Sequence, residues 1–348
     1  MKRILITGAN SYIGMSFERW MSQYSHNYVI DTLDMRDPSW QDKDLSLYDV
    51  VFHVAGIAHA DVSKVSDKTK QLYYDVNTNL TIQTAEKYKR DLKGKTGQFI
   101  FMSSIIIYGE ETNINKKRII TLNTEPNPSN FYGDSKLQAE IGISLINDDT
   151  FKVAILRPPM IYGAGSKGNY QQLKKIAKVF PVFPDVRNER SVLSIENLCI
   201  FLKERVDTQD SGIFFQKKKE YIRTSFLVRD IAKNNRKKVI LFSWMNWIVS
   251  LLGYVPGKIG KLTNKAFGNL VYSKECKKKK ITVKIIEINH NAKSKTLCTL
   301  LFNGKLYNKV HFPFRGLTIN SINSEYFYYD KEKDEIFYKD DGKKAMHL

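Results

Sequence analysis

The stretch of sequence that decides the fold is RILITGANSYIG, residues 3–14 of a 348-residue chain. Residues 3–7 are mostly aliphatic or β-branched and predict a short strand that ends at Gly8. A helix-like segment, residues 15–25, follows Gly14. Glycines at a strand-to-helix turn let the backbone approach a diphosphate group, which then lies at the partly positive N-terminus of the helix. The stretch therefore predicts the phosphate-binding turn of a dinucleotide site.

An acidic residue that fits the same site ends the second predicted strand, residues 28–34. Asp34 lies twenty residues beyond Gly14, where a carboxylate accepts hydrogen bonds from the adenosine ribose. A carboxylate there repels a 2′-phosphate and favours NAD over NADP, whereas Arg36 counts against that preference. We expect the cofactor to be NAD, with NADP as the alternative, held by Gly8, Asn10, Ser11, Tyr12, Ile13, Gly14 and Asp34.

Further strands and helices alternate along the first half of the chain. Strands are predicted over residues 49–55, 98–102 and 151–156, with helix-like segments at 68–88 and 135–146 between them. Apolar strands that alternate with helices indicate an α/β protein with a doubly wound parallel (Rossmann) sheet, which binds its ligands at the carboxyl ends of the strands.

The sequence also predicts how the chain is divided. We expect a dinucleotide-binding domain over residues 1–165, whose sheet is completed by parts of 190–216, and a smaller C-terminal substrate-binding or capping region over 166–280. Residues 281–348 form an atypical tail, with strand-like runs at 281–286 and 326–329, to which we assign no role.

The net charge of +19 comes mostly from one region. Residues 217–280 carry seventeen basic and three acidic side chains, whereas residues 1–216 carry 27 and 25. Lysine runs without a recognised binding module do not support nucleic-acid binding. Three widely separated cysteines indicate neither a disulfide framework nor a metal site, and no apolar leader precedes the first strand, so we expect a cytoplasmic protein.

Within this basic region, residues 239–255 predict a helix that is apolar except for one polar stripe, Ser243, Asn246, Ser250 and Gly253. Three interpretations remain open. The helix is buried in the capping region, or residues 236–270 rest on an anionic membrane through lysines and tryptophans, or the helix spans the bilayer, for which seventeen residues are few.

A catalytic pair is predicted on the helix-like segment that includes Tyr132 and Lys136. Four residues are about one helical turn, so both side chains point the same way. An ammonium group beside the phenol, together with a positively charged nicotinamide ring, is expected to lower the tyrosine pKa and make it a useful base. Ser103 and Ser104 follow the predicted strand 98–102, where a hydroxyl projects toward the ligand edge of the sheet.

In this order, the segments resemble the extended short-chain dehydrogenase/reductase family, in its NAD-dependent epimerase/dehydratase group of nucleotide-sugar enzymes. FHVAG at 52–56, FMSSIIIYG at 101–109 and LRPPMIYG at 156–163 add to the resemblance, which covers about residues 2–216. Ser11 departs from it, because the family has a glycine there. The resemblance implies catalytic roles for Ser104, Tyr132 and Lys136, cofactor contacts for Val54, Ala55, Gly56, Asn77, Ser103, Tyr132, Lys136 and Pro159, and substrate contacts for Ser104, Tyr132, Asn169 and Arg190.

The resemblance also narrows the reaction. Dehydratases of the family have acidic residues where this chain has Ile105 and Ile106, so dehydration is disfavoured. We expect an NAD-dependent 4-epimerase of a UDP-hexose or UDP-N-acetylhexosamine that serves surface polysaccharide synthesis, with a nucleotide-sugar 4-ketoreductase as the alternative. A non-catalytic NAD-binding or nucleic-acid-binding protein is the hypothesis from another class. The resemblance further implies a homodimer that uses the helix of Tyr132 and Lys136.

Overall fold

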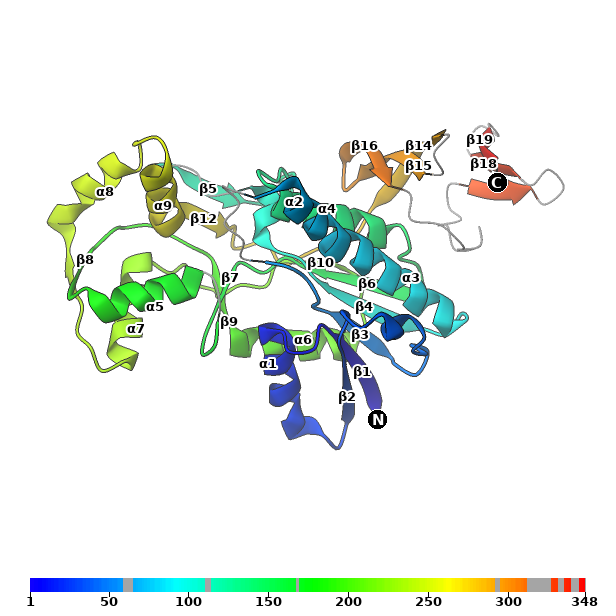
Figure 1. The fold of residues 1–348 in the computed structure, drawn as a ribbon, viewed down its shortest axis with the longest axis horizontal. Helices are drawn as coiled ribbons and strands as arrows, with labels where there is room; N and C mark the ends of the chain where they lie inside the picture. The colour runs from blue at the N-terminus through cyan, green and yellow to red at the C-terminus, as the bar shows by residue number, and fades with distance from the viewer. Residues whose placement is uncertain are drawn as a thin grey trace.

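A computed structural model describes residues 1–58, 65–109, 114–166, 169–291, 295–311, 327–330, 335–338 and 344–347. Its centre is a seven-stranded sheet in the order β2-β1-β3-β4-β6-β10-β13 (Figure 1). The strands are β1 Lys2–Thr7, β2 Tyr28–Leu33, β3 Val50–His53, β4 Gly97–Met102, β6 Phe151–Leu156, β10 Gly212–Phe214 and β13 Lys278–Lys279. Neighbouring strands are parallel except for β13, which is antiparallel to β10. The predicted α/β sheet is confirmed.

Helices cover both faces of this sheet (Figure 1). On one face lie α1 Tyr12–Met21 and α6 Ile195–Thr208, and on the other α2 Asp67–Tyr74, α3 Leu80–Leu92 and α4 Phe131–Ser144. Each face has its own hydrophobic cluster, with Phe17 and Leu202 on the first and Tyr88 and Ile141 on the second. The strands are apolar on both sides because both sides are buried. A 3₁₀ turn, η1 Ser22–Tyr24, follows α1.

The register of the sheet brings the ends of its strands together. Thr7, the last residue of β1, pairs with Leu33 of β2 and His53 of β3, and His53 pairs with Phe101 of β4. The residues that follow these four strands therefore leave the sheet at one edge, which is where doubly wound sheets bind ligands.

Two connections differ from the prediction. The helix expected over residues 68–88 is interrupted between α2 and α3 by a π-helical turn, η3 Asp75–Asn79. Such turns are frequent at functional sites. The connection between β2 and β3 contains only a 3₁₀ turn, η2 Pro38–Gln41, which is capped by the Asp37 side chain.

A smaller lobe with its own hydrophobic core lies beside the sheet (Figure 1). It pairs β5 with β12, β7 with β9 and β8 with β11. Its elements, with the turn η4 that leads into it, are η4 Ile105–Tyr108, β5 Lys117–Ile120, β7 Met160–Tyr162, α5 Asn169–Val179, β8 Val182–Pro184, β9 Val192–Ser194, α7 Thr224–Asn234, β11 Ile240–Phe242, η5 Ser243–Met245, α8 Asn246–Leu252, α9 Lys258–Phe267 and β12 Asn269–Tyr272.

The prediction of a single helix over residues 239–255 is wrong. Its first part, β11, pairs with β8, and only Asn246–Leu252 forms the helix α8. The β-branched residues Val239 and Ile240 suit an added strand better than a helix, and the partner strand decides the outcome. Across the part of the chain that the structure describes, no helix has the length and apolarity needed to cross a membrane.

The tail contains two small antiparallel sheets. They are formed by β14 Val283–Asn291, β15 Lys295–Phe302 and β16 Lys305–His311, and by β17 Phe327–Asp330, β18 Glu335–Tyr338 and β19 Lys344–His347. The predicted strand-like runs at 281–286 and 326–329 correspond to β14 and β17. Leu300 and Phe302 are buried in the same cluster as Ile141 of α4, so the first of these sheets belongs to the packed structure.

Candidate active site

The glycine turn has the close backbone approach that a phosphate site requires. Gly8 has a φ of +90°, and a Cβ there would lie 2.7 Å from the Ala55 amide nitrogen. Asn10 is also left-handed, with a φ of 65°. Ser11 has extended backbone, and its Oγ accepts a hydrogen bond of 3.1 Å from the Gly14 amide, which caps α1. The serine that departs from the family pattern therefore fits the turn without a positive φ.

The acid at the end of β2 is paired with the arginine that follows it. Asp34 accepts hydrogen bonds from Arg36, whose Nη2 lies 2.5 Å from its Oδ2. The side-chain hydrogen bond from Arg36 lowers the pKa of the exposed Asp34 carboxyl to about 2. Asp34 is thus an anion at neutral pH, and Arg36 stands beside it as the basic group that a 2′-phosphate would require.

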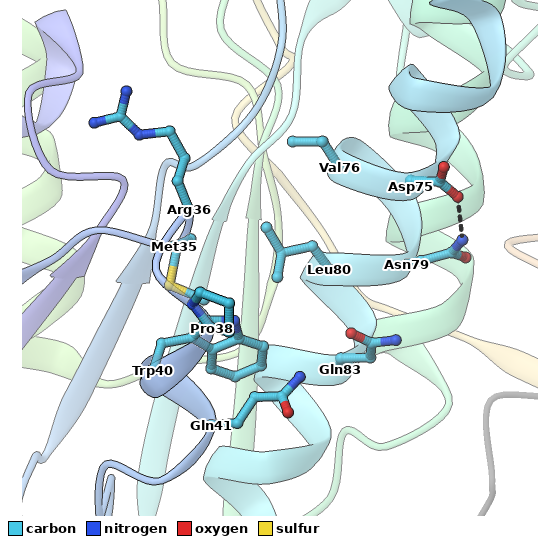
Figure 2. Close-up of a pocket in the computed structure, with 10 residues that line it drawn as sticks. All are labelled: Met35, Arg36, Pro38, Trp40, Gln41, Asp75, Val76, Asn79, Leu80 and Gln83. Atoms are coloured by element: carbon cyan, nitrogen blue, oxygen red, sulfur yellow. Dashed lines mark hydrogen bonds between the residues drawn. The ribbon is translucent and has the colours of Figure 1, made fainter. Parts of the chain in front are cut away.

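A cavity of about 390 Å³ opens directly after this acid, between the β2–β3 connection and the start of α3. In Figure 2, Trp40 and Pro38 face Leu80 and Gln83 across it. Its lining is Met35, Arg36, Pro38, Trp40, Gln41, Asp75, Val76, Asn79, Leu80 and Gln83. Half of the lining residues are apolar, among them Trp40 and Leu80, and the cavity lies next to Asp34. Together with the turn at Gly8, such a cavity is compatible with the adenine end of a dinucleotide, so the residues present fit this cofactor.

Asn77 joins the loop after β3 to α4. It is fully buried in the π-helical turn η3, where its Oδ1 accepts from the Ile57 amide at 2.8 Å and its Nδ2 donates to Ser135 Oγ at 3.1 Å. Gly56 lies against this junction, because a Cβ there would be 3.0 Å from Asn77 Oδ1 and 3.1 Å from Lys136 Nζ. The turn thus places the β3 loop directly beside Lys136.

Ser104, Tyr132 and Lys136 are brought to the same edge of the sheet. Ser104 follows β4 by two residues, and Tyr132 and Lys136 lie on the first two turns of α4. The Ser104 hydroxyl is near enough to the Tyr132 phenol to lower the phenol pKa. Lys136 is buried and donates from Nζ to the Met102 carbonyl at 3.0 Å. A hydroxyl pair beside a buried amine is an arrangement that can move a proton to or from an alcohol.

Burial controls the titration of this trio. Burial raises the pKa of Tyr132 to about 12, Tyr73 adds to the increase, and the hydrogen bond from Ser104 opposes it. Burial also lowers the pKa of Lys136 to about 8, against the influence of Glu140. Without a bound cofactor, desolvation of the phenolate is the largest effect on this pKa. The prediction that Lys136 together with a positively charged nicotinamide ring lowers the tyrosine pKa stays a prediction.

A buried ion pair next to Lys136 was not predicted from the sequence. Glu140, one turn beyond Lys136 on α4, lies 2.5 Å from Arg157, and their side chains are 0% and 2% exposed. Arg157 also donates to Tyr108 Oη at 2.6 Å, and Ser103 donates to Glu140. Two features of the sequence could have indicated this pair. Glu140 lies one helical turn after Lys136 in an otherwise apolar stretch, and Arg157 directly follows β6.

Other predicted contact residues have protein partners. Ser103, expected at the cofactor, donates to Glu140. Arg190, expected at the substrate, donates from Nη1 to the Lys265 and Ala266 carbonyls at 2.7 and 3.2 Å and so holds the end of α9. Pro159 is buried between β6 and β7, and the Asn169 side chain lies outside the described residues. The ligand roles of these four residues stay predictions.

Tyr12, which is also expected to contact the cofactor, lies between the glycine turn and Gly165. Its ring would lie 3.3 Å from a Cβ at Gly165. Its Oη is buried with no hydrogen-bond partner among the described residues, and burial raises its pKa to about 12. Because a buried hydroxyl without a partner costs free energy, this oxygen is a candidate hydrogen-bond donor to a bound ligand. Ile13 and Val54 are half-buried at the same turn.

Residues 4–186, just over half of the chain, match the profile of the NAD dependent epimerase/dehydratase family. The chain belongs to this family, as the resemblance in its motifs predicted. It is 27% identical over 301 residues to a UDP-glucose 4-epimerase of Vibrio cholerae, a match that covers 79% of this chain and 89% of that protein.

Solved structures of epimerases and of reductases share the fold. A UDP-glucuronic acid 4-epimerase from Bacillus cereus in complex with NAD is similar with a TM-score of 0.55 and 20% identity, covering 77% of this chain and 94% of that one. A dTDP-4-dehydrorhamnose reductase from Bacillus anthracis in complex with NADP gives 0.56 and 16%, covering 77% and 99%. At these identities the likeness shows the fold and leaves epimerase and reductase as alternatives.

Proposed function

We propose that the protein is an NAD-dependent nucleotide-sugar 4-epimerase that acts on a UDP-hexose or UDP-N-acetylhexosamine. The observation that carries the proposal is that Ser104, Tyr132 and the buried Lys136 lie together at the end of β4, at the sheet edge that also carries the glycine turn. The extent of the match to a UDP-glucose 4-epimerase, 89% of that protein, supports the same reaction.

Each part of the site has a role in holding the reactants. Gly8 packs against the Ala55 backbone and so shapes the turn that holds the diphosphate at the start of α1. Asp34 accepts from the adenosine ribose, and the neighbouring cavity takes the adenine. When bound, NAD supplies the hydride chemistry, taking hydrogen from C4 of the sugar and returning it. The protein's own contribution is to position both molecules and to handle the hydroxyl proton.

Proton transfer falls to the hydroxyl pair. Tyr132 takes the proton from the sugar 4-hydroxyl as the carbonyl forms and gives it back when the alcohol is restored. Ser104 donates a hydrogen bond to the same sugar oxygen. Lys136 supplies positive charge behind them, and Asn77 and Gly56 fix its surroundings.

A 4-ketoreductase is the second candidate, and one observation favours it. Arg36, with its side chain 81% exposed, stands beside Asp34 and offers a cation to a 2′-phosphate, which would suit NADPH. The two reactions use the same trio, so they differ in whether the cofactor stays bound and returns its hydride, or leaves after a single transfer.

The experiment is turnover of a panel of UDP-hexoses and UDP-N-acetylhexosamines by the full chain, with the sugar products separated chromatographically. An epimerase converts a substrate without added cofactor, and NAD remains bound through gel filtration. Net consumption of NADPH with a 4-keto sugar would establish the reductase instead. No conversion under either condition would favour a non-catalytic binding protein, and Tyr132→Phe serves as the inactive control.

The cellular setting belongs to the same proposal: a cytoplasmic enzyme that supplies a nucleotide sugar for surface polysaccharide. The homodimer through α4 has less support, because ten of the fourteen residues of α4 are already buried within one chain. Sedimentation velocity of the purified protein tests that point directly.

A further inference from the structure

The small lobe ends in a hairpin of two short helices with large apolar side chains in solvent. We define the hairpin patch as Trp244, Trp247, Leu251, Ile259 and Leu262, from η5, α8 and α9, and each of these residues is 56–65% exposed. Figure 1 shows α8 and α9 at one end of the molecule, away from the seven-stranded sheet. Five large apolar side chains exposed on two neighbouring short helices indicate an interaction surface.

The hairpin holds this orientation through its polar residues. Asn246 donates to the Asp185 carbonyl at 2.9 Å, and Ser250 donates to Asn115 Oδ1 at 2.8 Å. The Gly253 carbonyl accepts from Asn264 Nδ2 of α9 at 3.0 Å. Three residues of the polar stripe recognised in the sequence, Asn246, Ser250 and Gly253, therefore face the protein, whereas Ser243 is exposed. The apolar side chains of Trp244, Trp247 and Leu251 face outward, and Val249 is buried. The interpretation of this segment as a helix buried on most sides is wrong for the two tryptophans.

The segment that carries the patch has basic charges only. Residues 231–274 contain eight lysines and arginines and no acidic residue. Lys261 and Lys265 are exposed on α9, and Lys265 lies about 60° around the helix from Leu262. Basic residues among exposed tryptophans and aliphatic side chains are the composition of a helix that lies in the interface of an anionic bilayer.

We propose that the hairpin patch docks the protein on the surface of a bilayer that contains anionic lipids. The tryptophans and aliphatic side chains enter the headgroup region, and the lysines pair with lipid phosphates. The helices α8 and α9 have seven and ten residues, far fewer than a span requires, so the contact is peripheral. This inference is independent of the sugar reaction, because the patch contains none of the residues assigned to it.

The test is co-sedimentation of the full chain with vesicles of phosphatidylglycerol and phosphatidylcholine, compared with vesicles of phosphatidylcholine alone. The wild-type chain binds the anionic vesicles, and binding falls as salt is added. Trp247→Ser with Leu251→Ser weakens binding about tenfold or more, because apolar area is lost. Lys261→Gln with Lys265→Gln weakens it about 30-fold, since each lysine near an anionic surface contributes about fivefold.

Matched controls separate the patch from general surface effects. Ile200→Ser removes an aliphatic side chain that is 52% exposed on α6, and Lys68→Gln removes an exposed lysine on α2. Both are expected to bind vesicles as the wild type does, and circular dichroism verifies that every variant is folded. Absence of binding to anionic vesicles, or equal binding by the patch variants, would overturn the proposal. A dimer in sedimentation velocity that only the patch variants disrupt, without vesicle binding, would assign the patch to a second copy of the chain.

Discussion

Replacement of Glu140 by glutamine is the sharpest test of how the site is supported. The substitution keeps the shape of the side chain but leaves the guanidinium of Arg157 buried without a counter-charge. Arg157 reaches the Glu140 carboxylate through Nε, at 3.1 Å to both oxygens, and through Nη2 at 2.5 Å. Since both side chains are almost fully buried, we expect the free energy of unfolding to fall by about 3–5 kcal/mol.

The assay is urea unfolding of Glu140→Gln followed by circular dichroism, with two companions. Asp149→Asn removes an exposed partner of Lys152 and is expected to cost less than about 1 kcal/mol. Glu140→Gln combined with Arg157→Met removes both charges and is expected to recover most of the loss. A loss for Glu140→Gln as small as that of Asp149→Asn would refute the reasoning, because the buried pair would then not be a strong support.

Three further predictions concern the site itself. Tyr132→Phe reduces turnover by about 10²–10⁴-fold through loss of proton transfer, while circular dichroism shows that the variant is folded. A turnover loss below tenfold would contradict the role of the phenol. Gly8→Ala introduces a Cβ 2.7 Å from the Ala55 nitrogen, at a residue whose φ is +90°. Because this strains the turn, we expect calorimetry to show at least a tenfold loss of NAD affinity. Unchanged affinity would argue against the turn as the phosphate site. Burial lowers the pKa of Lys136 to about 8, so its ammonium form is lost above that pH. We therefore expect kcat/KM to fall as pH rises through about 8. A kcat/KM that stays constant up to the ordinary lysine pKa would show that catalysis does not use this charge.

The sequence was most informative where local chemistry and fold agree. Gly8, Asp34, Ser104, Tyr132 and Lys136 follow directly from strand ends and helical spacing, and the register of the sheet brings them to one edge. Those positions depend on backbone geometry that short motifs encode. The prediction of the parallel sheet succeeded for the same reason, because buried strands are apolar on both faces.

The features that the sequence did not predict depend on contacts between distant segments. The pairing of Glu140 with Arg157 joins α4 to the end of β6, and no local pattern specifies it. Residues 239–255 are apolar enough for a helix, yet the partner strand β8 takes the first part into a sheet. The burial of the Tyr132 phenol, which raises its pKa in the absence of cofactor, is likewise not revealed by spacing alone.

The central claim is that a hydride leaves C4 of the sugar and returns to it within one site. The most direct measurement follows UDP-galactose carrying deuterium at C4, incubated with the full chain without added cofactor, by mass spectrometry and NMR of the products. A 4-epimerase gives UDP-glucose that retains the deuterium at C4. Loss of the label to solvent or to free cofactor, or no conversion of this substrate and of the labelled UDP-N-acetylgalactosamine, would contradict the account.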